Sequence, residues 1–99
     1  MTITEVRITL VPDPRLRAFV SVTLDGVFVV KGLKVIEGKS GRVFLAMPSR
    51  RRPDGRYQDV AHPIRQEFRN VLEQAVLSEY SRRLRAEAEV EVGGDPATA

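Results

Sequence analysis

The chain has 99 residues, a length that suits one domain core, because domains usually run to about 100–150 residues. Hydrophobic residues make up 42% and charged residues 29%, which excludes a disordered chain and predicts a soluble, folded one. The absence of cysteine excludes disulfides and thiolate zinc sites. No run approaches the roughly 20 apolar residues of a membrane span, and residues 1–10 lack an export pattern. We therefore expect a cytoplasmic protein.

The charge is unevenly distributed along the chain. All 16 basic residues but only nine of the 13 acidic residues precede Ala86, which gives residues 1–85 a net charge of +7. The other four acidic residues follow, with no basic residue among them. We expect a single α+β domain over residues 1–85 and an acidic, disordered tail over residues 86–99. A body of this charge attracts polyanions, although a basic surface can also serve solubility alone.

Alternating apolar residues and β-branched runs predict four strands in the first half of the chain. Asp25-Gly26 separates two of these runs, and this dipeptide favours a type I′ hairpin turn, which needs positive φ at both central residues. Pro12 ends the first run and Pro48 the last, because proline lacks an amide donor. The expected strands cover residues 3–11, 16–24, 27–36 and 43–47.

Residues 48–59 hold two prolines and four arginines and read as a loop or an exposed hairpin. From Ile64 the apolar residues recur at helical spacing, so a long amphipathic helix follows. Pro63 suits its first turn, with His62 as the cap and Asp59 as the alternative cap. This order of elements predicts an α+β fold, with an antiparallel sheet of four to five strands followed by one C-terminal helix.

The second hairpin strand carries an unusual apolar run, Val27, Phe28, Val29 and Val30. A sheet with one face in water should alternate apolar and polar residues, so both faces of this run require cover. Unpaired edge strands also invite a second chain. We expect these four residues to form the interface of a sheet-mediated homodimer. The alternative is that the helix covers one face and a loop the other within one chain.

Patterns of catalytic chemistry are weak in this sequence. Gly38-Lys39-Ser40 looks like the end of a phosphate-binding loop, but Leu33 stands where that motif needs glycine, and a strand follows instead of a helix. His62 is the one histidine and has no partner for a metal shell or a nucleophile–base pair. Asp54, Asp59 and Glu67 could pair as carboxylates for acid–base catalysis. The arginines around them should instead keep all three ionised. We expect no enzyme activity, metal or cofactor.

The arginines of residues 48–59 form the strongest candidate binding site. Guanidinium groups are rarely buried unpaired, and their donors match phosphate oxygens. Tyr57 adds an aromatic face on which a base can stack, while Arg65 and Arg69 share one flank of the helix start. The expected nucleic-acid site consists of Arg50, Arg51, Arg52, Arg56, Arg65 and Arg69. The alternative is a solvated loop that its own aspartates partly neutralise.

A second basic cluster consists of Arg82, Arg83 and Arg85, near the expected carboxyl end of the helix. Cations at this end offset the negative pole of the helix dipole. We interpret the cluster as a stabilising feature of the helix and not as a binding site.

Several strings carry a family resemblance: ITEVRI, SVTLDGVFVV, KVIEG, FLAMPSRR, PDGRYQDVAHPI and VLSEY. In this order and spacing they resemble the SpoVG family (stage V sporulation protein G) over residues 3–80. The resemblance implies a small bacterial cytosolic regulator, linked to septation and sporulation, that binds DNA or RNA and dimerises through its sheet. Arg50 and Arg51 match the basic pair of that family. Arg42 stands where glycine is common and Arg52 where threonine is common, so this patch is more basic than usual.

Two functional hypotheses follow. The first is a non-enzymatic, dimeric regulator whose arginines contact the phosphates of DNA or RNA. The alternative is a protein-interaction adaptor in cell division that uses the sheet edge or the helix and does not bind nucleic acid directly. Replacing Arg50 and Arg51 by alanine should disable the first and leave the second intact.

Overall fold

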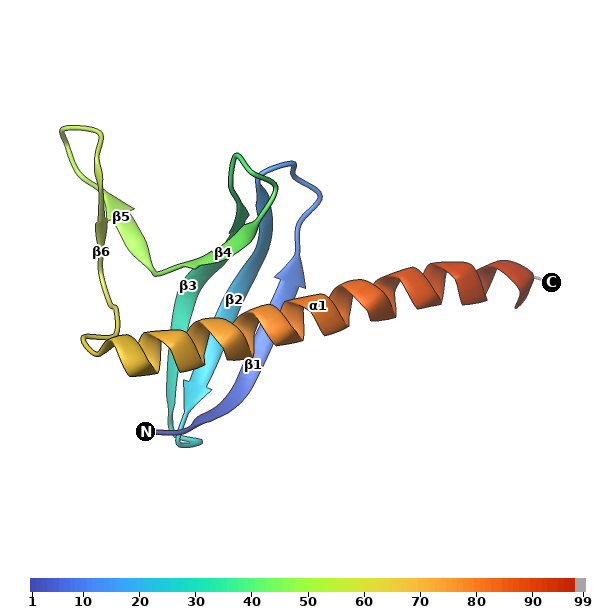
Figure 1. The fold of residues 1–99 in the computed structure, drawn as a ribbon, viewed down its shortest axis with the longest axis horizontal. Helices are drawn as coiled ribbons and strands as arrows, with labels where there is room; N and C mark the ends of the chain where they lie inside the picture. The colour runs from blue at the N-terminus through green and yellow to red at the C-terminus, as the bar shows by residue number, and fades with distance from the viewer. Residues whose placement is uncertain (98–99) are drawn as a thin grey trace.

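The computed structural model describes residues 1–97, with side chains described for residues 1–88. The elements in chain order are β1 (Ile3–Leu10), β2 (Leu16–Leu24), β3 (Phe28–Glu37), β4 (Val43–Ala46), β5 (Ser49–Arg51), β6 (Tyr57–Asp59) and α1 (Gln66–Ala97). The first four strands form an antiparallel sheet in the order β1-β2-β3-β4, and β5 pairs with β6 in a separate ribbon. The helix α1 crosses one face of the larger sheet (Figure 1). The expected α+β fold is confirmed.

The turn between β2 and β3 forms where the sequence predicts it. Asp25 and Gly26 have φ angles of 52° and 68°, the left-handed values that a type I′ turn requires. The Val27 amide donates to the Leu24 carbonyl at 3.0 Å. The Asp25 carboxylate also accepts a hydrogen bond of 2.8 Å from the amide of Thr2, which fastens the start of the chain to this turn.

The core lies between β2, β3 and α1. Along β2 the side chains alternate strictly in burial, with every second residue from Ala18 to Leu24 buried. On α1 the buried residues are Leu72, Val76 and Tyr80, spaced one turn apart, so one stripe of the helix faces the sheet. The hydroxyl of buried Tyr80 accepts a hydrogen bond of 3.2 Å from Arg17, which also pairs with Glu37 at 3.1 Å. The Tyr80 hydroxyl and the Arg17 guanidinium group therefore both have a hydrogen-bond partner, as buried polar groups require.

The helix begins later than the apolar spacing suggests. Its first residue is Gln66, and the Arg69 amide donates to the Arg65 carbonyl at 3.1 Å. The predicted cap is wrong, because His62 Nδ1 lies 3.0 Å from the carbonyl of its neighbour Pro63 and not against a helix amide. Ile64 is 92% exposed and belongs to the linker. Apolar periodicity cannot separate a linker residue from the first residue of a helix.

The interpretation of the second arginine cluster is also wrong, since α1 continues beyond it and no basic residue lies in the last turn of the helix. Arg82 instead pairs with Glu79 at 2.6 Å, and this hydrogen bond lowers the pKa of the Glu79 carboxyl. Arg83 donates to the Ile8 carbonyl of β1 at 3.1 Å. The helical backbone runs through most of residues 86–99, with residues 98–99 outside the described chain. The division into a domain and an acidic tail stays a prediction.

Candidate nucleic-acid interface

The arginine-rich segment is a two-stranded ribbon that projects from the body of the molecule (Figure 1). Every residue from Ser49 to Asp59 is exposed. The ribbon is closed at its base by the Val60 amide, which donates to the Pro48 carbonyl at 2.7 Å. Of the two readings that the sequence allowed, the exposed hairpin is therefore correct.

The tip of the ribbon is built by the string Arg52-Pro53-Asp54-Gly55-Arg56. Gly55 has a φ of 89°, a conformation that favours glycine, and its amide donates to the Arg52 carbonyl at 2.9 Å. The Asp54 carboxylate accepts a hydrogen bond of 3.0 Å from the Arg56 amide. These local bonds give the tip a defined shape without help from a hydrophobic core.

The strand register distributes the side chains over two faces. Arg50 lies opposite Gln58, and Arg51 lies opposite Tyr57. Directly paired residues share a face and neighbouring residues alternate, so one face presents Arg50 with Gln58 and the other presents Arg51 with Tyr57. Each face thus combines a guanidinium group with a second group that can contact a base: an amide on one side and a phenol ring on the other.

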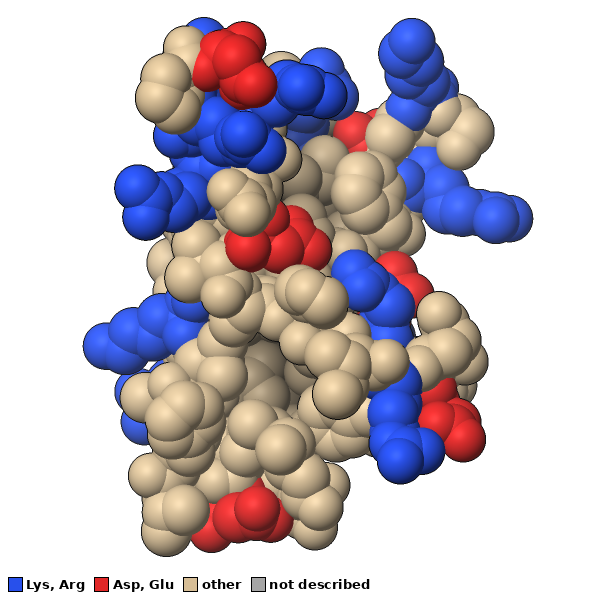
Figure 2. All heavy atoms as spheres, turned by 90° about the vertical axis from the view of Figure 1, so that its left-hand side faces the viewer, with Lys and Arg blue, Asp and Glu red and all other residues tan. Residues whose placement is uncertain are grey.

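The charges of the ribbon are only partly compensated. Arg56 pairs with Asp54 at 3.4 Å, and both side chains are exposed, so this pair contributes little to stability. Arg50, Arg51 and Arg52 form no ion pair within the described part of the chain. Figure 2 shows Lys and Arg gathered at the upper end of this side of the molecule, where the ribbon lies. The ribbon is therefore a surface that attracts anions.

A shallow cavity of about 430 Å³ connects three of these arginines. Arg50, Arg51 and Arg52 line it together with Gln58 and Asp59. Sequence reasoning missed Gln58, because its place beside Arg50 depends on the register of the ribbon. The Pro-Asp-Gly string could have indicated this pairing, because a turn centred on it determines which residues of the two strands lie opposite one another.

The two helix arginines stand apart from this cavity. Arg65 lines a different, apolar cavity beside the start of α1, and Arg69 is half-buried on the first turn of the helix. The structure thus groups Arg50, Arg51 and Arg52 along one cavity, whereas Arg56, Arg65 and Arg69 do not line it. That Arg65 and Arg69 belong to one nucleic-acid site with the ribbon arginines stays a prediction.

The expected interface residues lie at the opposite end of the sheet from the β1–β2 connection (Figure 1). Val27 is 86% exposed, Phe28 63% and Val29 47%, and Val30 is half-buried. The alternative in which the helix and a loop cover both faces of this run does not hold for the first three residues. The homodimer interface expected at these residues stays a prediction.

Other chemistries find little support in the structure. Among the described residues, no three His, Asp or Glu side chains lie close enough together to hold a metal ion. Within the same residues, α1 has no stretch that is both long and apolar enough to cross a bilayer. The ribbon is thus the feature of the described chain that combines exposure, charge and defined geometry.

These features define a class of small α+β proteins in which a helix-covered antiparallel sheet carries a projecting basic ribbon. The family model of SpoVG matches residues 1–82, and the chain belongs to the SpoVG family. The resemblance seen in the sequence is confirmed.

Three curated relatives show the extent of the similarity, and each is named "Putative septation protein SpoVG". The protein of Anaeromyxobacter sp. (strain Fw109-5) is 51% identical over 85 residues, covering 86% of this chain and 87% of the relative. The Bdellovibrio bacteriovorus protein is 47% identical over 89 residues, or 90% and 82% of the two chains. The Priestia megaterium protein is 47% identical over 95 residues, or 95% and 98%. The name that they share is that of a septation protein and not of an enzyme.

Proposed function

We propose that this protein is a non-enzymatic, cytoplasmic regulator that binds DNA or RNA through the β5–β6 ribbon and acts in septation or, in spore formers, in sporulation. The septation role is supported by the name of its relatives. The observation that carries the binding proposal is the projecting ribbon, whose residues Arg50, Arg51 and Arg52 have no ion-pair partner within the described chain.

The two faces of the ribbon suit two kinds of contact. A two-stranded ribbon fits the major groove of duplex DNA, where arginine pairs with guanine and glutamine with adenine. The face that carries Arg50 and Gln58 has these two groups. A tyrosine stacks on the bases of single strands, and the face that carries Arg51 and Tyr57 has this group. The surrounding arginines would hold the phosphates of either polymer.

The binding free energy should be largely electrostatic. If Arg50, Arg51, Arg52 and Arg56 each neutralise one phosphate, log K falls against log salt with a slope of about −3 to −4. The slope on single strands should be slightly shallower than on duplex, because each contact releases fewer condensed ions. An affinity that does not depend on salt would contradict the proposal.

The experiment is a fluorescence-anisotropy titration of wild type and of the triple variant Arg50→Ala, Arg51→Ala, Arg52→Ala. Each protein is titrated into a short duplex DNA and a single-stranded RNA at two salt concentrations. The matched control, Arg7→Ala, Arg15→Ala, Arg82→Ala, removes the same charge from the body. We expect loss of binding in the ribbon variant and near wild-type binding in the control. Equal losses in both would show that only the overall charge matters.

We also propose that the protein is a homodimer through Val27, Phe28, Val29 and Val30. Two ribbons in one particle would grip one strand or duplex more tightly than one ribbon, because the second contact forms at high effective concentration. Sedimentation velocity of the wild-type protein tests this directly. A monomer at the concentrations that support binding would remove the dimer from the proposal.

A second candidate function is a cell-division adaptor that meets a protein partner without binding nucleic acid. The exposure of Val27, Phe28 and Val29 favours it, because contiguous exposed apolar residues often mark a protein contact. Failure of the wild-type protein to bind either polymer in the titration above would favour this candidate.

A further inference from the structure

The β3–β4 turn contains the string Gly38-Lys39-Ser40, which lacks the first glycine and the following helix of a phosphate-binding loop. The turn nevertheless has a defined shape. The Gly38 amide donates to the Arg42 carbonyl at 2.9 Å, and the Gly41 amide donates to the Gly38 carbonyl at 3.0 Å. Gly41 has a φ of 83°, a conformation that favours glycine. The turn therefore places Lys39 and Arg42 at the end of a closed hairpin.

The two cations of this turn are not compensated within the described chain. Lys39 and Arg42 are exposed, and neither forms an ion pair with a described residue. Glu37, two residues before Lys39, pairs instead with Arg17 at 3.1 Å. The positive charges of the turn are therefore available to an anion from outside the chain.

An exposed aromatic ring lies close to these cations. Phe44 on β4 is 43% exposed, and its neighbour Leu45 is buried in the core, so the ring lies on the face of the sheet away from α1. A Cβ added at Gly38 would lie 3.5 Å from the ring, so the ring packs against the backbone of the turn. Ile36 lies opposite Phe44 in the strand register and shares its face. The hairpin thus supports the ring and leaves part of it in water.

The hairpin end repeats the chemistry of the ribbon face that carries Arg51 and Tyr57, where a cation lies beside an exposed aromatic ring. Such a ring can stack on an unpaired base of a single strand while cations contact the phosphates. The ribbon and the β3–β4 turn both project away from α1, toward the same side of the molecule (Figure 1). Figure 2 shows Lys and Arg on both sides of that end.

The chain limits the distance between the hairpin and the ribbon. Phe44 and Arg50 are six positions apart in the sequence, so their Cα atoms are at most about 22 Å apart. Phosphates follow one another at about 3.4 Å along one strand of a duplex, so this distance corresponds to about six or seven nucleotides. A single strand of ordinary binding-site length, about 4–16 nucleotides, can therefore reach both places.

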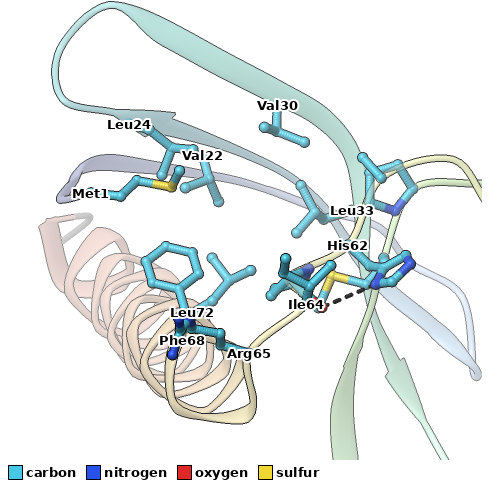
Figure 3. Close-up of a pocket in the computed structure, with 14 residues that line it drawn as sticks. Met1, Val22, Leu24, Val30, Leu33, His62, Ile64, Arg65, Phe68 and Leu72 are labelled. Carbon is cyan, nitrogen blue, oxygen red and sulfur yellow. Dashed lines mark hydrogen bonds between the residues drawn. The ribbon is translucent and has the colours of Figure 1, made fainter.

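The other route away from the ribbon leads toward α1 and is apolar. A pocket of about 570 Å³ lies there, with Pro48 at the ribbon base and Arg65 before the helix in its lining (Figure 3). Phe68 of α1 faces the strand residues Val22 and Leu33 across it. A phosphate on such a surface loses hydration and gains no hydrogen-bond partner. The basic route over the β3–β4 turn is therefore the better path for a polyanion.

We propose that the end of the β3–β4 hairpin is a second site for single-stranded nucleic acid, in which Lys39 and Arg42 contact phosphates and Phe44 stacks on a base. This inference rests on the ribbon as the primary binding surface and adds the direction in which the bound strand continues. A strand that spans both sites binds more tightly than a short one, because the second contact forms at high effective concentration. The site is selective for single strands, whose bases are free to stack on a side chain.

Oligomer length tests the second site. Wild type and the variant Lys39→Ala, Arg42→Ala are titrated by fluorescence anisotropy with single-stranded DNA of about four and about twelve thymidines. The variant should bind the longer oligomer about tenfold or more weakly, with a log–log salt slope shallower by about 1.4, or about 0.7 for each lost contact. Both proteins should bind the shorter oligomer equally. The control Arg82→Ala, Arg85→Ala removes the same charge from α1 and should match wild type.

Tryptophan fluorescence tests the stacking. The chain contains no tryptophan, so Phe44→Trp introduces a single reporter. A base stacked on the indole should quench its fluorescence, whereas Val71→Trp, at an exposed position on α1, should not be quenched. Quenching of Phe44→Trp by a thymidine or a uridine oligomer supports the site and identifies the polymer. Phe44→Leu keeps an apolar side chain without a flat ring and should weaken binding about fivefold or more.

The outcomes separate this inference from the proposal on which it rests. Because these variants replace exposed side chains, each should keep the circular-dichroism spectrum of wild type. Wild-type affinity of the Lys39→Ala, Arg42→Ala variant for the longer oligomer, with no quenching of Phe44→Trp, would overturn the second site and keep the ribbon. Loss of binding in this variant but not in the ribbon variant would overturn the ribbon as the primary surface and keep the hairpin site. A wild type that binds neither oligomer would overturn both.

Discussion

The body and the ribbon of this protein are stabilised in different ways. In the body, every second side chain of β2 from Ala18 to Leu24 is buried, and one stripe of α1 completes the core. In the ribbon every side chain is exposed, and its shape depends on turn hydrogen bonds and short strand pairing. Packing therefore explains the apolar residues of the body but gives no reason for three consecutive arginines in the ribbon. Residues without a role in packing are the ones to examine for binding.

The largest expected effect lies in the body. Leu45 on β4 is 7% exposed and belongs to the core. Leu45→Ala should lower the free energy of unfolding by about 2–5 kcal/mol, because it removes buried methyl groups and leaves a cavity. Urea denaturation followed by circular dichroism measures this change. Tyr57→Ala in the ribbon is the control and should stay within about 0.5 kcal/mol of wild type.

The second expected effect is on binding and not on stability. Arg51→Ala should weaken binding to duplex DNA about tenfold or more, because a hydrogen-bonded ion pair with phosphate is lost. The log–log salt slope should become shallower by about 0.9, the value for one phosphate contact. Anisotropy titrations at several salt concentrations give both numbers. An unchanged slope with reduced affinity would assign Arg51 a structural role instead.

The third prediction separates the two faces of the ribbon. Tyr57→Ala should weaken binding to single-stranded RNA by about 1–3 kcal/mol, the usual contribution of a stacked base. Gln58→Ala should leave that affinity nearly unchanged and reduce the preference among duplex sequences. Parallel titrations of both variants against both polymers measure the difference. If both variants lose affinity for both polymers to the same degree, the two faces do not act separately.

The smallest expected effect concerns the exposed ion pair at the tip. Asp54→Asn keeps an oxygen that can accept the Arg56 amide hydrogen bond but removes the charge beside the Arg56 guanidinium. Binding to duplex DNA should become tighter by about 0.2–1 kcal/mol, the range for an exposed pair. The same anisotropy titration detects it at low salt. Weaker binding would mean that the carboxylate itself orients Arg56.

Local signals predicted most of the fold. The Asp25-Gly26 turn, the strand periodicity around it and the helical spacing after Ile64 depend on neighbouring residues, and the structure confirms the elements that they indicate. The start of α1 was missed by two residues, because an apolar linker residue continues the helical spacing. Boundaries depend on hydrogen bonds that periodicity does not report.

Features that depend on distant residues were not predictable from the sequence. Glu73 contacts Leu45 on β4, which is 28 positions away in the sequence. Arg83 contacts Ile8 on β1, which is 75 positions away. The apolar pocket is lined by strands, linker and helix together, and no local pattern marks it. In the candidate site the arginines were visible as a charge run, but their division between two faces required the pairing register.

The most direct test of the central claim is an amide chemical-shift titration of the ¹⁵N-labelled protein with a short duplex DNA and a single-stranded RNA. If the ribbon is the binding surface, the largest shift changes should fall on residues 49–59, with those of β2 and the middle of α1 nearly unmoved. Changes concentrated on residues 27–31 or on α1, with the ribbon unaffected, would contradict the claim.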